Sequence, residues 1–151
     1  MARQSKYKFN GTAPKSDIWN AGLYIRLSRE DGDKSESESI ASQRAITEQF
    51  VNAHDGINIC DYYVDDGWSG TDFARPEFKR MFDDITSKRI NCVIVKDLSR
   101  FGRNYVEAGK YLEVVFPMLG VRFIAVNDMI DSIESSSIIS LCLSEGSFLY
   151  P

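Results

Sequence analysis

Short apolar runs alternate with longer segments of helical periodicity between residues 21 and 126. Four runs rich in β-branched and aromatic residues predict strands: AGLYIRL (21–27), INICDYYV (57–64), NCVIVK (91–96) and VRFIAV (121–126). Strands that alternate with helices at this spacing predict a mainly parallel β-sheet with helices on both faces, which is a three-layer α/β fold.

Two amphipathic segments separate the first three predicted strands. The first begins near Ser39, a candidate N-cap, and its apolar residues Ile46, Phe50 and Ala53 recur at helical spacing. The second begins at Pro76, because proline suits the first position of a helix. Its apolar stripe comprises Phe78, Met81, Phe82 and Ile85. Both segments are therefore predicted to be helices that cover the sheet.

A third and longer helix is predicted from about residue 105 to residue 118. Its expected buried side comprises Ala108, Leu112, Val115, Phe116 and Leu119. Pro117 lies near the end of this segment. Because proline lacks the amide that would continue the helical hydrogen bonds, we expect Pro117 to kink the helix or to end it early.

The two ends of the chain differ in composition from the predicted domain of residues 20–131. Residues 1–19 carry basic side chains among Gly, Pro, Ser and Asn, and this composition predicts a flexible arm. Residues 132–151 are serine-rich and apolar without a clear period, so they form an atypical tail. With 151 residues, 43% of them hydrophobic, the chain has enough material for one compact domain.

Composition also excludes several classes of function. No run approaches the roughly 18 apolar residues of a membrane span, and the start lacks the apolar core of a signal peptide, so we expect a cytoplasmic protein. Cys60, Cys92 and Cys142 form no CxxC pair, which argues against a disulfide framework or a zinc site. We expect Cys60 and Cys92 to be core residues of strands. His54 is the only histidine, so a Ser-His-Asp triad or a histidine-based metal site is not indicated, and no cofactor is expected.

Polar side chains follow three of the predicted strands. Ser28 follows the first strand, Asp65 and Asp66 follow the second, and residues 97–103 follow the third. The carboxyl ends of parallel strands lie at the same edge of a sheet, and ligands bind there in folds of this class. We therefore expect these side chains to converge on one rim.

Four arginines are predicted to surround the Ser28 hydroxyl: Arg26, Arg75, Arg100 and Arg103. Arg100 and Arg103 are three residues apart at a predicted helix start, so both guanidinium groups should reach the same side. Taken singly, each arginine is best interpreted as a surface residue and Ser28 as a turn residue. Guanidinium groups bind phosphate oxygens in pairs and stabilise the charge of a five-coordinate phosphoryl transition state. Together, these residues predict a phosphate site.

The net charge of −4 has the wrong sign for a general nucleic-acid binder, so any contact with DNA must be local. Five ordered motifs nevertheless match a known family: YIRLS (24–28), SIASQR (39–44), DDGWSGTDFARPEF (65–78), VIVKDLSRFGRN (93–104) and VRFIAVND (121–128). Over residues 20–131 they resemble the catalytic domain of serine site-specific recombinases of the resolvase/invertase family, especially the large recombinases of integrative and transposable elements.

This resemblance implies a nucleophile. Ser28 would attack a DNA phosphodiester and form a 5′-phosphoserine bond, leaving a free 3′-hydroxyl. Arg26, two residues before it on the strand, would face the same phosphate. The other site residues that the resemblance implies are Gln43, which helps to position the site, Arg75, Asp66, Arg100 and Arg103. Strand cleavage, exchange and rejoining would then need neither ATP nor a metal.

The resemblance also implies that double-stranded DNA recombination sites are the partner, and that dimers associate into a tetramer that joins two sites. Two departures stand out. Ser99 occupies a position where many small members have an aspartate, and the nearest acid is Asp97. The family continues into a long dimerisation helix and a DNA-binding region, which residues 132–151 do not resemble. We therefore expect a truncated catalytic domain that is weak or inactive alone.

Two other functions are compatible with the same residues. One is a non-catalytic regulatory or assembly module that pairs with an intact recombinase. The other is a phosphate-sensing domain, such as a response-regulator receiver, that would use Asp65, Asp66 and Lys96. Receivers need their acids on the first and third strands, whereas this acidic pair follows the second strand. The receiver interpretation is therefore the weakest of the three.

Overall fold

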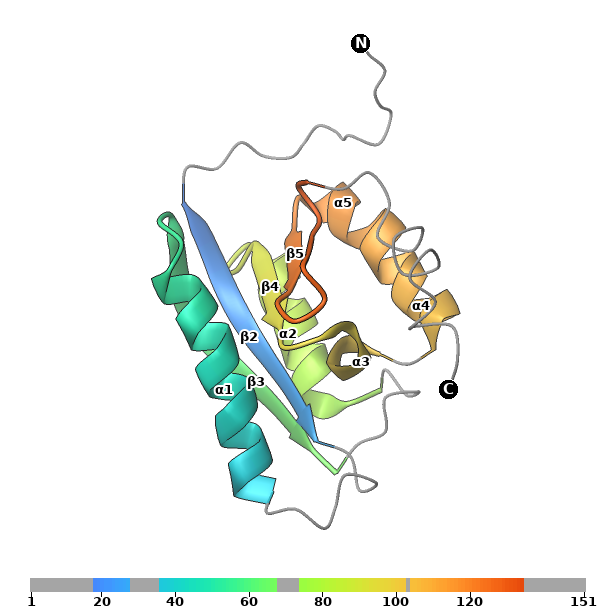
Figure 1. Ribbon diagram of the computed structural model, residues 1–151. Coiled ribbons are helices and arrows are strands. Elements are labelled where there is room, and N and C mark those ends of the chain that lie inside the picture. The colour runs from blue at the N-terminus through green and yellow to red at the C-terminus, as the bar shows by residue number, and fades with distance from the viewer. Residues whose placement is uncertain (1–17, 28–35, 68–73, 103, 135–151) are drawn as a thin grey trace.

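The computed structural model of the chain describes residues 18–27, 36–67, 74–102 and 104–134 (Figure 1). Its sheet comprises β2 (Trp19–Leu27), β3 (Ile57–Asp66), β4 (Cys92–Val95), β5 (Arg122–Ala125) and β6 (Ile130–Asp131). The strand order is β3-β2-β4-β5-β6, and the first four strands in this order are parallel, whereas β6 pairs with β5 in the antiparallel direction. All four predicted strands are therefore confirmed, and β6 is an addition.

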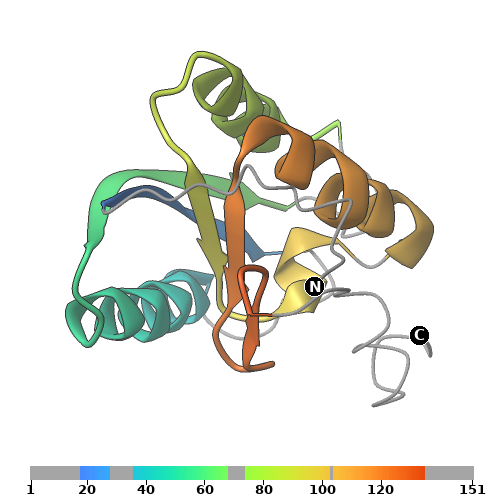
Figure 2. The same ribbon diagram turned by 90° about the horizontal axis from the view of Figure 1, so that it is seen from above.

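Helices cover both faces of this sheet, as the view from above shows (Figure 2). Helix α1 (Glu36–Asn52) lies on one face. Helix α2 (Pro76–Thr86) and the segment formed by α4 (Tyr105–Lys110), η2 (Tyr111–Val115) and α5 (Phe116–Leu119) lie on the other. The short α3 (Leu98–Phe101) follows β4. This arrangement confirms the predicted three-layer α/β fold.

Two apolar clusters fill the spaces between these layers. Towards α2 and α5, the core is rich in aromatic residues and includes Tyr24, Tyr63, Phe78, Phe101, Phe116 and Phe123. Towards α1, it is smaller and includes Trp19, Leu23, Val51, Ile57 and Ile94. The strands contribute alternate residues to the two clusters, because successive side chains of a strand point to opposite faces. Within the described residues, no helix is both long and apolar enough to cross a membrane.

The buried side of α1 differs from the prediction. The helix begins at Glu36, so Ser39 lies inside its first turn rather than at its N-cap. Gln43 and Thr47 are buried together with Val51, whereas Ala53 is exposed. The hydroxyl of Thr47 donates to the Gln43 carbonyl at 2.9 Å, one turn earlier in the helix. A polar residue can be buried where it finds such partners, and the apolar pattern alone gives no sign of them.

The sequence predicts that Pro117 either kinks the last helix or ends it early. The helix does not end early, because helical structure continues to Leu119. The preceding residues, Tyr111–Val115, form a π-helical turn, which places Pro117 in the first turn of α5. The missing proline amide is tolerated at such a position. Gly120 ends the helix in the left-handed conformation with φ 73°, where glycine carries no steric cost.

A bulge changes the register between β2 and β3. Ala21 pairs with Ile59, but Gly22 pairs with Asp61, so Cys60 is the extra residue. Cys60 is exposed, which corrects the expectation that it belongs to the core, whereas Cys92 is fully buried as expected.

This extra residue reverses which side chains of β3 face each layer. Ile57 and Ile59 contact the cluster beneath α1, whereas Tyr63 belongs to the aromatic cluster on the opposite face. Asp65 follows Tyr63 at a spacing of two and also faces α2. A one-residue change of register turns every later side chain to the other face. The bulge therefore brings Asp65 to the face that carries Tyr24.

Candidate active site

The expected rim forms at the carboxyl ends of β2, β3 and β4. Arg26 is opposite Asp65 in the paired strands, and Leu27 is opposite Asp66. Helix α3 begins three residues after β4 and contacts β2. Ser28 and Arg103, two of the predicted site residues, lie outside the described residues.

Arg26 joins the end of β2 to α3. Its side chain is fully buried, and its Nε and Nη2 atoms donate to the carbonyl oxygens of Arg100 at 3.3 Å and Ser99 at 2.9 Å. Arg100 returns the contact, since its Nη1 atom donates to the Arg26 carbonyl at 3.2 Å. These reciprocal bonds hold Arg26 and Arg100 together, although 74 residues separate them in the sequence.

Arg75 reaches the C-terminal end of the same helix from the start of α2. It is the N-cap residue of α2 and is fully buried. Its Nη1 atom donates to the Tyr24 hydroxyl at 3.0 Å, and its Nη2 atom donates to the Phe101 carbonyl at 2.8 Å. The guanidinium carbon also lies 5.2 Å from the centre of the Phe78 ring, within the range of a cation–π contact.

Side chains therefore hold both ends of α3. At its N-terminus, Asp128 accepts a hydrogen bond from the Leu98 amide at 2.7 Å, and Asp97 accepts one from the Arg100 amide at 3.2 Å. At its C-terminus, Arg26 and Arg75 bind the last three carbonyl oxygens. Carboxylates at the N-terminus and cations at the C-terminus match the direction of the helix dipole. This match stabilises a helix of only four residues.

Arg103 lies outside the described residues, so the shared side expected for Arg100 and Arg103 stays a prediction. Helix α3 ends at Phe101, and Gly102 has an extended backbone with φ −179° and ψ 143°. Asn104 then caps α4 as a separate helix by accepting hydrogen bonds from the amides of Val106 and Glu107. The spacing of three residues therefore crosses the break between α3 and α4 and does not lie within one helix.

Gln43 binds the main chain of the same strand from α1. Its Nε2 atom donates to the Arg26 carbonyl at 3.1 Å, and its Oε1 atom accepts a hydrogen bond from the Arg26 amide at 3.3 Å. Gln43 is buried, with 1% of its surface exposed. Arg26 is thus held at its main chain by Gln43 and at its guanidinium group by α3.

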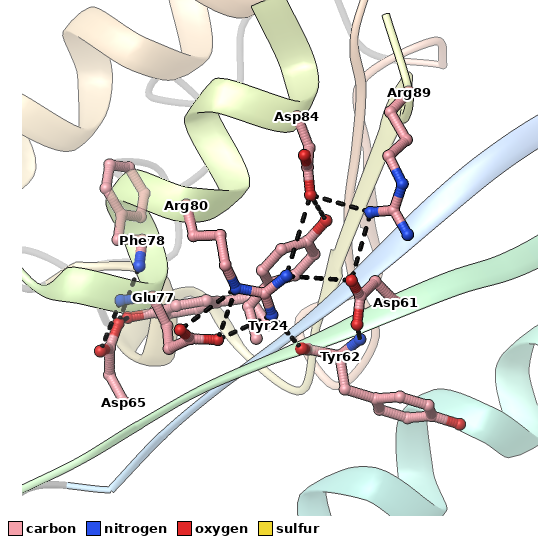
Figure 3. A network of polar contacts seen from close by, with 10 residues as sticks. Tyr24, Asp61, Tyr62, Asp65, Glu77, Phe78, Arg80, Asp84 and Arg89 are labelled. Carbon is pink, nitrogen blue, oxygen red and sulfur yellow. Dashed lines mark hydrogen bonds and ion pairs between the residues drawn. The ribbon is translucent and has the colours of Figure 1, made fainter. Parts of the chain in front are cut away.

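The two aspartates at the end of β3 have different environments. Asp66, the predicted site residue, is exposed. Asp65 is buried and accepts hydrogen bonds from the Tyr24 hydroxyl and from the amides of Glu77 and Phe78 (Figure 3). The resemblance implies the exposed carboxylate of the pair, Asp66, as a site residue, and this stays a prediction. For Asp65, the signal in the sequence is Pro76, because the helix that begins at Pro76 needs a hydrogen-bond acceptor at its N-terminus.

Burial raises the pKa of the Tyr24 hydroxyl, with a further increase from Asp65, while the positive charge of Arg75 opposes the shift. Tyr24 therefore keeps its proton at neutral pH and can donate it to Asp65. Ser99, at the position that departs from the family pattern, donates its hydroxyl hydrogen to Asp97 at 2.6 Å. The Asp97 carboxylate therefore lies beside Ser99, although Asp97 precedes Ser99 by two residues in the sequence.

A second group of arginines lies further from the rim, on the outer side of β3 and α2. Asp61, Glu77, Arg80, Asp84 and Arg89 form an outer cluster of ion pairs (Figure 3). Arg80 contacts Glu77 at 2.8 Å and Asp61 at 3.0 Å, and Arg89 contacts Asp84 at 2.9 Å. In the described part of the chain, no group of three or more His, Cys, Asp or Glu side chains is arranged to hold a metal ion.

Comparisons with known proteins agree with this geometry. The family model "Resolvase, N terminal domain" matches residues 21–142. The structure resembles the N-terminal catalytic domain of TP901-1 integrase, with 26% identity, a TM-score of 0.70, and coverage of 83% of this chain and 91% of that one. It also resembles a resolvase family site-specific recombinase from Streptococcus pneumoniae, with 31% identity, a TM-score of 0.67, and coverage of 84% and 85%.

A third structure shows the same fold at lower identity. The catalytic domain of ISC1926 TnpA, an IS607-like serine recombinase, has 22% identity and a TM-score of 0.59 over 71% of this chain and 70% of that one. No curated protein sequence matches the chain. The family model covers most of the chain and includes every strand of the rim, and two structures of recombinase domains are similar in both sequence and fold. The chain belongs to the resolvase family of serine site-specific recombinases, and it carries the N-terminal catalytic domain of that family.

Proposed function

We propose that this domain cleaves, exchanges and rejoins DNA strands through a 5′-phosphoserine intermediate formed on Ser28. The observation that carries the proposal is the convergence of Arg26, Arg75 and Arg100 around α3, directly beside the end of the strand that leads into Ser28. Guanidinium groups held by their surroundings stabilise a developing phosphoryl charge without reorganising during the reaction.

In the proposed step, the Ser28 oxygen attacks the phosphorus atom of a DNA phosphodiester. The bond from phosphorus to the 3′-oxygen breaks as the bond from phosphorus to the serine oxygen forms. The serine hydroxyl loses a proton and the leaving 3′-oxygen gains one, so a phosphodiester is exchanged for a phosphoserine diester and a free 3′-hydroxyl. The reverse reaction with a different 3′-hydroxyl rejoins the strands, and no external energy source is required.

The residues around Ser28 would have different roles in this step: some would contact the phosphate, and others would position those residues. Arg100 and Arg103 would contact the phosphate, with Asp66 on the same rim. Arg26 and Arg75 are fully buried and hold the segment that carries Arg100 and leads to Arg103, so their contribution includes positioning that segment. Gln43 would keep the Arg26 main chain, and hence the start of the Ser28 segment, in place.

The proposed partners are double-stranded DNA sites and further copies of the chain, first in a dimer and then in a tetramer. Exposed apolar side chains on α4, η2 and α5 support self-association: Val106 is 73% exposed, Val114 50% and Met118 77%. Large apolar side chains on a helical surface commonly mark contacts with another protein. We place the reaction in the cytoplasm, where such DNA sites are found.

The chemical test is to trap the intermediate. Because the domain is expected to be weak or inactive alone, it is joined to the dimerisation helix and DNA-binding region of an intact relative and incubated with DNA that carries that relative's recombination site. The mixture is denatured, and DNA that remains attached is recovered and sequenced. Mass spectrometry of the digested protein then identifies the modified peptide. We expect a nucleotide adduct on Ser28, and no attached DNA with Ser28→Ala.

Ser99→Ala is the matched control, because Ser99 is a serine on the same rim whose hydroxyl contacts Asp97. This variant should still become attached to DNA. Attachment that persists in Ser28→Ala, or an adduct on another residue, would contradict the assignment of the nucleophile. Absence of any adduct in the joined protein with an unmodified catalytic domain would contradict the proposed function.

A further inference from the structure

Asp65 is a buried carboxylate that has no role in the reaction proposed above. It is the penultimate residue of β3, and only 2% of its surface is exposed. Its Oδ1 atom accepts a hydrogen bond from the Glu77 amide at 2.9 Å. Its Oδ2 atom accepts one from the Phe78 amide at 3.0 Å and another from the Tyr24 hydroxyl at 2.8 Å (Figure 3). A buried carboxylate with three donors is held in one orientation.

Two of these bonds fix the main chain beside Arg75. Arg75 is the N-cap residue of α2, and its own side chain makes no capping hydrogen bond. The amides of Glu77 and Phe78 occupy the second and third positions of the helix, which a capping side chain normally satisfies. Asp65 supplies that oxygen from β3 instead. The start of α2, and with it the Cα atom of Arg75, is therefore tied to the end of β3.

The third bond fixes the guanidinium group of Arg75. A carboxylate has no hydrogen to donate, so the Tyr24 hydroxyl must donate to Asp65. A guanidinium group cannot accept, so Arg75 must donate to the Tyr24 oxygen, which it does at 3.0 Å. The directions of both hydrogen bonds are therefore determined by the residue types. The elevated pKa of Tyr24 keeps the required proton in place.

We propose that Asp65 is a positioning residue of the active site, which holds Arg75 at its main chain through the α2 amides and at its guanidinium group through Tyr24. Arg75 in turn binds the Phe101 carbonyl at the end of α3, from which the chain leads to Arg103. The inference rests on the proposed function, because it assigns to Asp65 a role in the phosphoryl transfer at Ser28. It also separates the roles of the two adjacent aspartates, since Asp66 is exposed on the rim.

The test compares two tyrosines. Tyr24→Phe removes the hydroxyl between Asp65 and Arg75 and keeps the aromatic ring. Tyr63→Phe is the matched control, since Tyr63 is also buried in the aromatic core and also donates to a carboxylate, that of Asp84, at 2.6 Å. Asp65→Asn is the third variant, because it alters the carboxylate with little change of volume.

The first measurement is the ¹⁵N NMR spectrum of the Arg75 guanidinium group, assigned with Arg75→Lys. Bound at both Nη atoms, this group should rotate slowly and give separate Nη1 and Nη2 signals. We expect these signals to merge in Tyr24→Phe and in Asp65→Asn, and to stay separate in Tyr63→Phe. Unchanged signals in Tyr24→Phe would overturn the proposal.

The second measurement is the rate of phosphoserine formation on a trapped DNA fragment. A catalytic group displaced by about 1 Å can cost roughly a hundredfold in rate, so we expect a loss of about that size in Tyr24→Phe. In a chain that already carries Arg75→Ala, Tyr24→Phe should remove nothing more, because both changes disable the same group. A purely structural role of Tyr24 would instead give losses that multiply, and that result would overturn the proposal.

The two proposals fail in different ways. If the joined protein with an unmodified catalytic domain forms no adduct at Ser28, the proposed function fails, and the NMR spectra still decide whether Asp65 and Tyr24 hold Arg75. If the joined protein forms the adduct, but its Tyr24→Phe variant reacts as fast as its Tyr63→Phe variant, the proposed function stands and the positioning role of Asp65 is wrong.

Discussion

The two groups of arginines in this domain use the same side chain in opposite environments. Arg26 and Arg75 are fully buried, and they donate to carbonyl oxygens of α3 and to the Tyr24 hydroxyl. Arg80 and Arg89, in the outer cluster, have side chains that are 42% and 49% exposed and that pair with carboxylates. The first pair connects segments that are far apart in the sequence, whereas the second lies along the surface of α2 and β3.

This difference determines what each group can contribute. A hydrogen bond from a buried cation is not screened by salt, and its loss leaves buried carbonyl oxygens without a donor. An exposed ion pair gains little, because water and salt weaken the attraction and two long side chains must be ordered. We therefore expect the buried arginines to maintain both the fold and the site, and the outer cluster to contribute only modestly to stability.

The largest expected effect is that of Arg26→Ala compared with Arg89→Ala. Arg26→Ala removes the donor from two carbonyl oxygens at the end of α3 and leaves a cavity, so it should lower the free energy of unfolding by about 3 kcal/mol or more. Arg89→Ala should cost much less, because the ion pairs of Arg89 are exposed to water and salt. Urea unfolding followed by circular dichroism measures the free energy of unfolding of both variants. Equal losses would mean that the buried arginines stabilise the fold no more than the outer cluster does.

A smaller effect is expected from Gly22→Ala, which disturbs the outer cluster from within the core. A Cβ atom on Gly22 would lie 2.6 Å from the Tyr63 ring and 2.9 Å from the Ile90 side chain. The Tyr63 ring lies beneath Arg80, and its hydroxyl binds Asp84, so its displacement should weaken the outer cluster. We expect a loss of about 1–3 kcal/mol in the free energy of unfolding.

The double variant Gly22→Ala, Ile90→Val is the control for this clash, because valine lacks the atom that the new Cβ would approach. It should regain part of the lost stability. Folded Gly22→Ala should still form the phosphoserine bond at the normal rate, because the hydrogen bonds of Arg26 and Arg75 are untouched. A rate that falls as far as in Tyr24→Phe would show that the two groups are coupled.

The smallest expected effect is the pH dependence of the outer cluster. Partial burial of Asp61 opposes its charged form, but hydrogen bonds from Arg80, the Tyr62 amide and Arg89 outweigh this and lower the pKa of its carboxyl group. Since the folded pKa is lower than the unfolded value near 4, the stabilisation is present above about pH 4 and is lost as pH falls through the folded value.

Asp61→Asn tests this sign. At pH 7 the variant should be less stable than the unmodified chain by about 0.5 kcal/mol, and the difference should shrink as the pH falls from 5 to about 3. High salt should shrink it as well. Urea unfolding across this range gives the measurement. A difference that grows on acidification would mean that the carboxylate is destabilising in the folded state.

The fold and the location of the site could be predicted from local patterns. Alternating apolar runs identified β2, β3, β4 and β5, and the stripe of Phe78, Met81 and Ile85 identified the buried side of α2. The positions after the strands identified the rim, because all parallel strands end at the same edge. These features depend on spacing within a few residues, which the sequence contains directly.

The features that local patterns do not predict have a common cause in contacts between distant segments. The apolar run around Cys60 predicts a core residue, but Cys60 is the extra residue of the bulge and is exposed. Gln43 was found only through the family resemblance, because the apolar pattern of α1 gives no reason to bury an amide. The resemblance implies Asp66 as a site residue, which stays a prediction, whereas the contacts of Asp65 with the start of α2 are not visible in the local sequence.

By itself, the sequence determined the order of the elements, the parallel sheet, and the presence of arginines next to the end of β2, since these follow from short-range periodicity and residue type. Tertiary structure decided which arginines are buried, which aspartate faces α2, and where α3 stops. The physical reason is that a buried charge or amide is stable only when it meets specific partners, and those partners are up to 74 residues away.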